Sequence, residues 1–333
     1  MKYENKILLL VAVPVVLGFL LLGVGRYSVP FDHVVECIWS FIVSPTGSTE
    51  ETVVMEVRFP RIVMSAIVGC ALAMAGTVFQ STLSNPLASP DVIGVSSATA
   101  FGAALAIFIG LSAFPMQFLA LAMGLVALAV VFFICKSSHS SSILSIVLAG
   151  IIIAGVFNAL IALIKYIADP LTQLPDITYW LMGSLSGKGY DTILNALPLF
   201  LIGAIVIYAL RWRLNIISLD DEEIRALGHD PAKLRWTFML AATLLVATSV
   251  SLCGQIGWIG LVIPHIARLV VGSDNSRVIP VSMVLGATFL MVCDTICRSL
   301  IAAEIPLSIC TALIGAPIFA VLFIRRQRSW SRI

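Results

Sequence analysis

The chain has 333 residues, of which 59% are hydrophobic and 11% are charged, and its formal net charge is +2. This composition excludes a soluble globular domain of that length, and the small net charge gives no sign of a nucleic-acid partner. We therefore expect an all-α polytopic membrane protein, with membrane lipid around a single transmembrane domain that covers residues 1–333.

Apolar stretches that are long enough, or nearly long enough, to cross a bilayer follow one another along the chain. The eighth is short and contains Pro264, His265 and Arg268, so a partial or re-entrant helix is an alternative there. The first is expected to stay in the mature chain, because residues 21–25 make a poor signal-peptidase site. The sequence predicts about ten spans, at 7–25, 61–83, 96–111, 115–135, 143–166, 192–210, 237–256, 258–271, 280–303 and 306–324.

The basic residues predict the orientation of these spans. With ten spans and a cytoplasmic N-terminus, about 14 of the 20 Lys and Arg fall on the cytoplasmic side. We therefore expect both termini in the cytoplasm, the segments 26–57 and 167–191 outside, and the segment 211–236 inside.

Two arginines at the outer end of the second span break this trend. Arg58 and Arg61 belong to the run RFPR, and their spacing of three places both on one helix face. One interpretation is contact with lipid headgroups or with a buried acidic partner such as Glu56. The other is an electropositive surface that receives carboxylates of an external protein, which Arg298 could join.

Small residues recur at spacings that let helices approach closely, which predicts a tightly packed bundle. Asn158, a polar residue in the fifth span, is a candidate for lining a transport path. The outer run 180–187, which includes Gly183, Ser184 and Leu185, is another candidate. Between spans two and three the sequence NPLASP predicts a break, which can be a simple proline-rich turn. The small residues are Gly69, Ala73, Gly76, Ala98, Gly102, Gly150 and Ala154.

A charged segment, SLDDEEIRALGHDPAKLRW at 218–236, separates spans six and seven. Its helix start and stop signals predict two short helices. Ser218 and Asp221 predict a capping box for the first, Gly228 can end it in the left-handed conformation, and Asp230 can cap the second. The segment is either an ordinary solvated loop or a docking site for a soluble partner.

No motif supplies catalysis, metal binding or an energy source. The 7 cysteines and 4 histidines are dispersed, without metal-ligand spacing. The run GSLSGKG at 183–189 is no phosphate loop, because its glycines are too close and Gly189 replaces the required Ser or Thr. Ionisable residues typical of ion-coupled carriers are scarce at mid-span. We expect no catalytic residue, no metal and no bound cofactor, which disfavours an intramembrane enzyme.

Six runs follow one another over nearly the whole chain: RFPR at 58–61, NPLASPDVIGVSSATA at 85–100, WLMGSLSG at 180–187, ALGHDPAKLRW at 226–236, GWIGLVIPHIARLVVG at 257–272 and EIPLSICTALIGAPIFAVLF at 304–323. Together they resemble the iron-chelate and cobalamin (FecCD-type) permease family of ABC importers. The resemblance implies ten spans in a bacterial or archaeal cytoplasmic membrane, and a homodimer or a dimer with a close paralogue.

The resemblance also implies partners and cargo. Two cytoplasmic ABC ATPases, which use ATP and Mg, would energise the import of a metal chelate, with a ferric siderophore expected first and haem or cobalamin as alternatives. A secondary carrier that needs no ATPase remains the alternative function.

Site residues follow from the same resemblance. An external binding protein would dock at Arg58, Arg61 and Arg298, Asn85 and Leu87 would lie at the inner gate, and the 180–187 run would lie beside the path. The ATPases would meet the coupling surface Arg225, Ala226, Leu227, Gly228 and His229.

Overall fold

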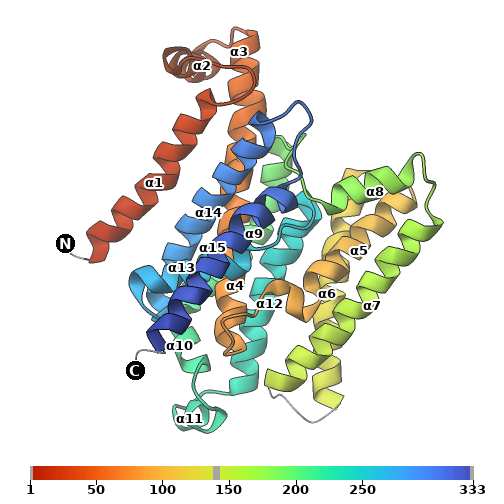
Figure 1. Ribbon diagram of the computed structural model, residues 1–333, viewed down its shortest axis with the longest axis vertical. Coiled ribbons are helices and arrows are strands. Elements are labelled where there is room, and N and C mark those ends of the chain that lie inside the picture. Colours follow the sequence, from red (N-terminus) through yellow and green to blue (C-terminus); the bar gives the residue numbers. More distant parts are fainter. Residues whose placement is uncertain (1–2, 138–142, 331–333) are drawn as a thin grey trace.

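The computed structural model describes residues 3–137 and 143–330, and every regular element within these ranges is a helix (Figure 1). The all-α class is therefore confirmed for the described chain. The predicted cytoplasmic placement of the two termini involves residues 1–2 and 331–333, which lie outside the description, and it stays a prediction.

Each of the ten predicted apolar stretches coincides with a helix. Six helical stretches are long and apolar enough to cross a membrane: Thr49–Thr82, Ala113–Ser137, Ile143–Ile167, Tyr190–Leu210, Pro231–Cys253 and Asn275–Ser299. Four apolar helices are shorter: Ala12–Gly23, Val95–Phe108, Ile259–Val271 and Leu307–Leu322. The helices are α1 (Tyr3–Gly23), α4 (Phe59–Thr82), α5 (Val95–Phe108), α6 (Ala113–Ser137), α7 (Ile143–Ile167), α9 (Tyr190–Leu210), α12 (Pro231–Cys253), α13 (Ile259–Val271), α14 (Asn275–Ser299) and α15 (Leu307–Trp330).

Short helices occupy the two ends of the bundle. At one end lie α2 (Phe31–Val43), α3 (Thr49–Glu51) and the π-helical turn η1 (Thr52–Arg58), and the opposite end carries α10 (Arg213–Ile217) and α11 (Asp221–Ala226) (Figure 1). Two further short elements are η2 (Pro90–Ile93) and α8 (Gln173–Leu181).

Helix α4 lies at the centre and packs against α12, α13 and α14. The close contacts are made by glycines, as the small-residue pattern predicts. A Cβ atom on Gly69 would lie 2.2 Å from the carbonyl oxygen of Gly286, and one on Gly76 would lie 2.0 Å from that of Gly260. Side chains at these positions would push the helices apart, so glycine sets the spacing around α4.

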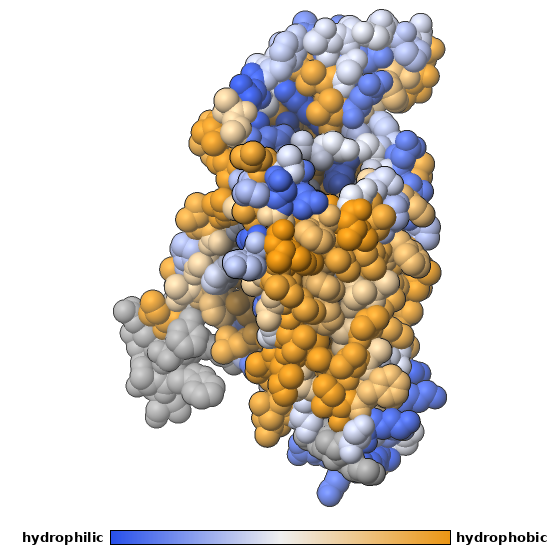
Figure 2. All heavy atoms as spheres, turned by 90° about the vertical axis from the view of Figure 1, so that its right-hand side faces the viewer, coloured by the Kyte–Doolittle hydropathy of each residue, from blue (hydrophilic) through white to orange (hydrophobic). Residues whose placement is uncertain are grey.

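Burial differs sharply between the inner and outer helices. In the stretch that contains α4 and in α12, 78% of an apolar 18-residue segment is buried inside the protein. In α6 and α7 only 33% of the corresponding segment is buried. Figure 2 shows the resulting surface: an apolar band between two hydrophilic ends. Such a band suits contact with lipid or with other membrane subunits.

The 218–236 segment folds differently from the prediction. The capping box is formed by Asp220 and Glu223, not by Ser218, whose hydroxyl donates to the Leu214 carbonyl 3.2 Å away. Gly228 has φ +79°, as predicted, and Asp230 accepts hydrogen bonds at the start of α12. The second helix is not short: α12 continues to Cys253, because nothing breaks the apolar run that follows Pro231.

Candidate functional site

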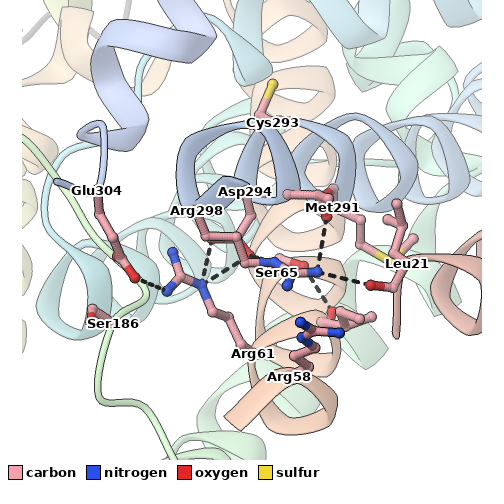
Figure 3. A network of polar contacts seen from close by, with 12 residues as sticks. Leu21, Arg58, Arg61, Ser65, Ser186, Met291, Cys293, Asp294, Arg298 and Glu304 are labelled. Atoms are coloured by element: carbon pink, nitrogen blue, oxygen red, sulfur yellow. Dashed lines mark hydrogen bonds and ion pairs between the residues drawn. The ribbon is translucent and has the colours of Figure 1, made fainter. Parts of the chain in front are cut away.

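The RFPR arginines are buried in a polar network at the end of the bundle that carries α2 (Figure 3). Arg61, on α4, is 6% exposed. Its Nε lies 2.9 Å from Oδ1 and 3.0 Å from Oδ2 of Asp294 on α14, and its Nη1 donates to Oε1 of Glu304 at 2.7 Å. Arg61 therefore joins α4, α14 and the loop between α14 and α15.

The other two arginines bind backbone carbonyls at the end of α1. Nη1 of Arg58 donates to the Leu22 carbonyl at 2.7 Å, and Nη2 donates to that of Tyr27. Nη2 of Arg298 donates to the Leu21 carbonyl at 2.9 Å, while its Nε lies 3.9 Å from Asp294 without a hydrogen bond. Carbonyl groups left unpaired at the end of α1 are thus satisfied by guanidinium groups.

This geometry differs from the exposed electropositive surface that the sequence suggested. The three guanidinium groups are buried, and the acidic partners are Asp294 and Glu304 rather than the exposed Glu56. The described residues of the network include three arginines and two carboxylates, so a positive charge remains in excess. One oxygen of Glu304 is buried without a hydrogen-bond partner. Docking through Arg58, Arg61 and Arg298 stays a prediction.

Arg26, which the sequence alone did not single out, lies directly beside this network. Arg26 is exposed, and its Nη1 donates to the Ala302 carbonyl at 2.8 Å, in the loop that carries Glu304. The neighbouring Gly25 has no room for a side chain, since its Cβ would lie 2.5 Å from Nη2 of Arg58. The available signal was an outer basic residue in the 26–57 segment, the same signal that singled out Arg58.

At the opposite end, the predicted coupling residues form an exposed turn. Arg225, Ala226, Leu227 and Gly228 are exposed, and Leu227 reaches 59% exposure. The turn is anchored to the bundle, because Ile224 is fully buried and Nη2 of Arg235, on α12, lies 2.6 Å from Oδ1 of Asp221. His229 is partly buried beside the turn.

A second link, also missed from the sequence, ties this end to α14. Asn215, on α10, donates to Asp274 at 2.8 Å and accepts from the backbone N–H of Asn275 at 2.8 Å. Burial acts to raise the pKa of Asp274, but hydrogen bonds from Asn215 and Ser276 outweigh it and hold that pKa below its ordinary value. A charged Asp274 thus caps α14 and anchors α10.

The predicted inner-gate residues lie on an exposed turn after α4. Asn85 and Leu87 are exposed, and Oδ1 of Asn85 accepts from the Leu87 N–H at 2.9 Å. The preceding Ser84 has φ +45°, a conformation that costs energy in a residue other than glycine. Asn85 also lines a cavity of about 1010 Å³ next to Asn215 and Arg268.

The predicted path residues lie near a second cavity, of about 460 Å³. Asn158 lines it together with residues of α8 and the start of α15. Gly183 has φ +78°, and its carbonyl accepts from Leu307, while the Ser184 N–H donates to Cys253. Leu185 is fully buried. The 183–185 run therefore fastens α8 to α12 and α15 beside the cavity.

Comparisons with known proteins agree with this architecture. Residues 10–325 match the model of the FecCD transport family. The molybdate import system permease protein MolB of Haemophilus influenzae is 40% identical over 315 residues, which cover 94% of each chain. The hemin transport system permease protein HmuU of Yersinia pestis is 34% identical over 283 residues, covering 83% of this chain and 84% of that protein.

A solved structure extends the agreement to three dimensions. It is described as a metal-chelate-type ABC transporter in an inward-facing conformation, and it is 39% identical to this chain, with a TM-score of 0.88. The match covers 97% of this chain and 100% of the other. The chain therefore belongs to the FecCD transport family and is the permease component of an ABC importer.

Proposed function

We propose that this permease carries a metal chelate or a metal oxyanion into the cytoplasm, with ten spans and both termini in the cytoplasm. In this proposal it works as a homodimer, or paired with a close paralogue, in a bacterial or archaeal cytoplasmic membrane. One observation carries the mechanism: α14 joins the two ends of the bundle. Asp294 and Arg298 belong to the arginine network, and the start of α14 is bonded to Asn215 of α10.

The outer end is proposed to receive a substrate-binding protein. Arg58, Arg61 and Arg298 exceed their carboxylate partners by one charge, which favours an added carboxylate from outside. Arg26 is exposed above them and can meet that carboxylate first. Because Arg61 already holds Glu304, docking at Arg61 requires this internal pair to open.

The inner end is proposed to receive two ATPase subunits. Arg225, Ala226, Leu227, Gly228 and His229 present a compact surface whose base is fixed by buried Ile224 and by the ion pair of Arg235 with Asp221. Because this base is fixed, a displacement of the surface by the ATPase would move α12. The contacts of Asn215 would transmit the same displacement to α14. ATP and Mg would act in the partner subunits, with no cofactor bound here.

The path is proposed to run beside α7, α8 and α15. Asn158 would face the cargo, Gly183, Ser184 and Leu185 would fix the wall, and Asn85 with Leu87 would close the inner side. A ferric siderophore, haem or cobalamin fits the expectation from the sequence. The similarity to MolB supports molybdate as a further candidate.

The docking step can be tested with the purified permease and its cognate binding protein. We expect Arg26→Glu to weaken association by about tenfold at low salt and less at high salt, because salt screens exposed charges. Lys136→Glu, at the opposite end of the bundle, is the matched control and should leave association unchanged. Equal affinity of the wild type and Arg26→Glu at low salt would contradict docking at this surface.

A further inference from the structure

The loop between α14 and α15, residues 300–306, is fixed by two arginines from other parts of the chain. Nη1 of Arg61, on α4, donates to Oε1 of Glu304 at 2.7 Å (Figure 3). Nη1 of Arg26, which follows α1, donates to the Ala302 carbonyl at 2.8 Å. The position of this loop therefore depends on side chains at the end of the bundle where the binding protein is proposed to dock.

The two carboxylates that bind Arg61 differ in how firmly they are held. Asp294 lies within 3.0 Å of the Arg61 Nε through both oxygens, and its side chain is 1% exposed. The Glu304 side chain is 31% exposed, and it is bound through Oε1 alone. Its Oε2 is buried without a hydrogen-bond partner among the described residues, which costs free energy. Of the two carboxylates, Glu304 is thus the one that a group from another protein can replace.

Glu304 is also close to the start of α15, since it lies three residues before Leu307, where that helix begins. The N–H groups of Leu307 and Ser308 donate to the carbonyls of Gly183 and Met182, at 2.9 Å and 3.1 Å. Met182 and Ser308 in turn line the cavity of about 460 Å³. A displacement of Glu304 would therefore reach the wall of this cavity through a short length of chain.

From this arrangement we infer that Glu304 is an internal competitor of the binding protein. Its carboxylate occupies Nη1 of Arg61, a donor that a carboxylate of the binding protein requires. Docking exchanges one carboxylate for the other on the same guanidinium group, so a charge-assisted contact is kept. The exchange releases the 300–306 loop and loosens the start of α15 beside the cavity. The inference rests on the proposed function, because it concerns the regulation of the proposed docking surface.

Another role for Glu304 would be purely structural, as a fixed partner that keeps Arg61 in place. The two roles predict opposite effects on docking. A structural partner supports the docking surface, so its loss weakens association or leaves it unchanged. A competitor opposes docking, so its loss strengthens association.

The test measures the affinity of the purified permease–ATPase complex for its cognate binding protein at low salt. Glu304→Gln should raise this affinity at least about fivefold, because the apparent affinity is reduced by the fraction of permease in which Arg61 is occupied. Glu304→Asp keeps the charge but shortens the side chain, and it should raise the affinity by a smaller factor. Glu56→Gln removes an exposed carboxylate from the same end of the bundle, and as the charge-matched control it should change the affinity less than about twofold.

Hydrogen exchange gives a second readout, which a change in net charge alone would not alter. The amides of Leu307 and Ser308 should exchange faster when the binding protein docks on the wild type, and in Glu304→Gln they should exchange fast without it. Unchanged or weaker binding by both Glu304 variants, or exchange that docking leaves unaltered, overturns the internal competitor while docking itself stands. Absence of any association with the wild type overturns the docking proposal and the competitor with it.

Discussion

Arg61 and Asp294 are 233 residues apart in the chain, yet the guanidinium Nε lies within 3.0 Å of both carboxylate oxygens. Both side chains are buried, with exposures of 7% for Arg61 and 1% for Asp294. The pair joins α4 to α14 at the end of the bundle where the binding protein is proposed to dock.

Removal of the carboxylate charge should therefore destabilise the fold. Asp294→Asn leaves the buried Arg61 with Glu304 as its remaining acidic partner, and breaking a buried pair costs about 3–5 kcal/mol. We expect a clearly lower melting temperature in detergent. Asp176→Asn, which alters an exposed carboxylate, serves as the control. Equal melting of Asp294→Asn and the wild type would show that the pair does not hold α4 to α14.

The contact between Gly69 and Gly286 predicts a second effect on stability. Gly69→Ala places a methyl group 2.2 Å from the Gly286 carbonyl, so α4 and α14 must separate. Overpacking of this kind costs about 1–3 kcal/mol. Gly155→Ala is the matched control on α7, because nothing lies within 4 Å of its added Cβ. Thermal unfolding of the two variants in the same detergent compares them, and equal melting temperatures would argue against the close packing.

The exposed turn after α11 predicts an effect on ATPase association. Leu227 is 59% exposed at the proposed coupling surface, and Leu227→Glu puts a charge into a contact that excludes water. Co-purification with the ATPase should fall at least about tenfold, while membrane insertion stays normal. Leu171→Glu changes a leucine that is 87% exposed near the other end, and it should leave association intact. Equal loss in both variants would point to a general folding defect.

His33 and Glu50 predict a pH dependence at the end of the bundle that carries α2 (Figure 1). A hydrogen bond with Glu50, 2.9 Å away, and the charge of that carboxylate raise the pKa of His33 above its ordinary 6.5. Because the folded pKa is raised, the contact between α2 and α3 stabilises the protein fully below the unfolded pKa. The contribution disappears as pH rises through the folded pKa.

The wild type should therefore melt higher than His33→Gln at about pH 5.5 and equally at about pH 9. The difference is expected to be small, because the pair is partly exposed. A difference that grows with pH would contradict the assigned sign.

The sequence predicted the helices well because a bilayer leaves few alternatives. Backbone groups in hydrocarbon must be paired internally, so each long apolar run becomes a helix. Local chemistry also placed the turn at Gly228 and the cap at Asp230. The prediction of Ser218 as the capping residue was wrong, because Asp220 with Glu223 satisfies the same capping pattern two residues later.

The partners of the arginines could not be predicted in the same way. The choice of Asp294 and Glu304 for Arg61 depends on α4 lying beside α14, which is a property of the bundle rather than of any local run. The role of Asn215 could likewise not be predicted, since its hydrogen bonds to Asp274 and Asn275 join α10 to α14 across about 60 residues of chain. Long-range packing decides such contacts, and sequence spacing contains no record of it.

ATP-driven uptake in proteoliposomes tests the central claim most directly. The permease is reconstituted with its ATPase, the loaded binding protein is supplied outside, and cargo inside the vesicles is measured with ATP or with a non-hydrolysable analogue. Accumulation that requires hydrolysable ATP, and that is lost in Leu227→Glu, is the predicted result. Accumulation that proceeds equally without the ATPase would contradict the account and favour a secondary carrier.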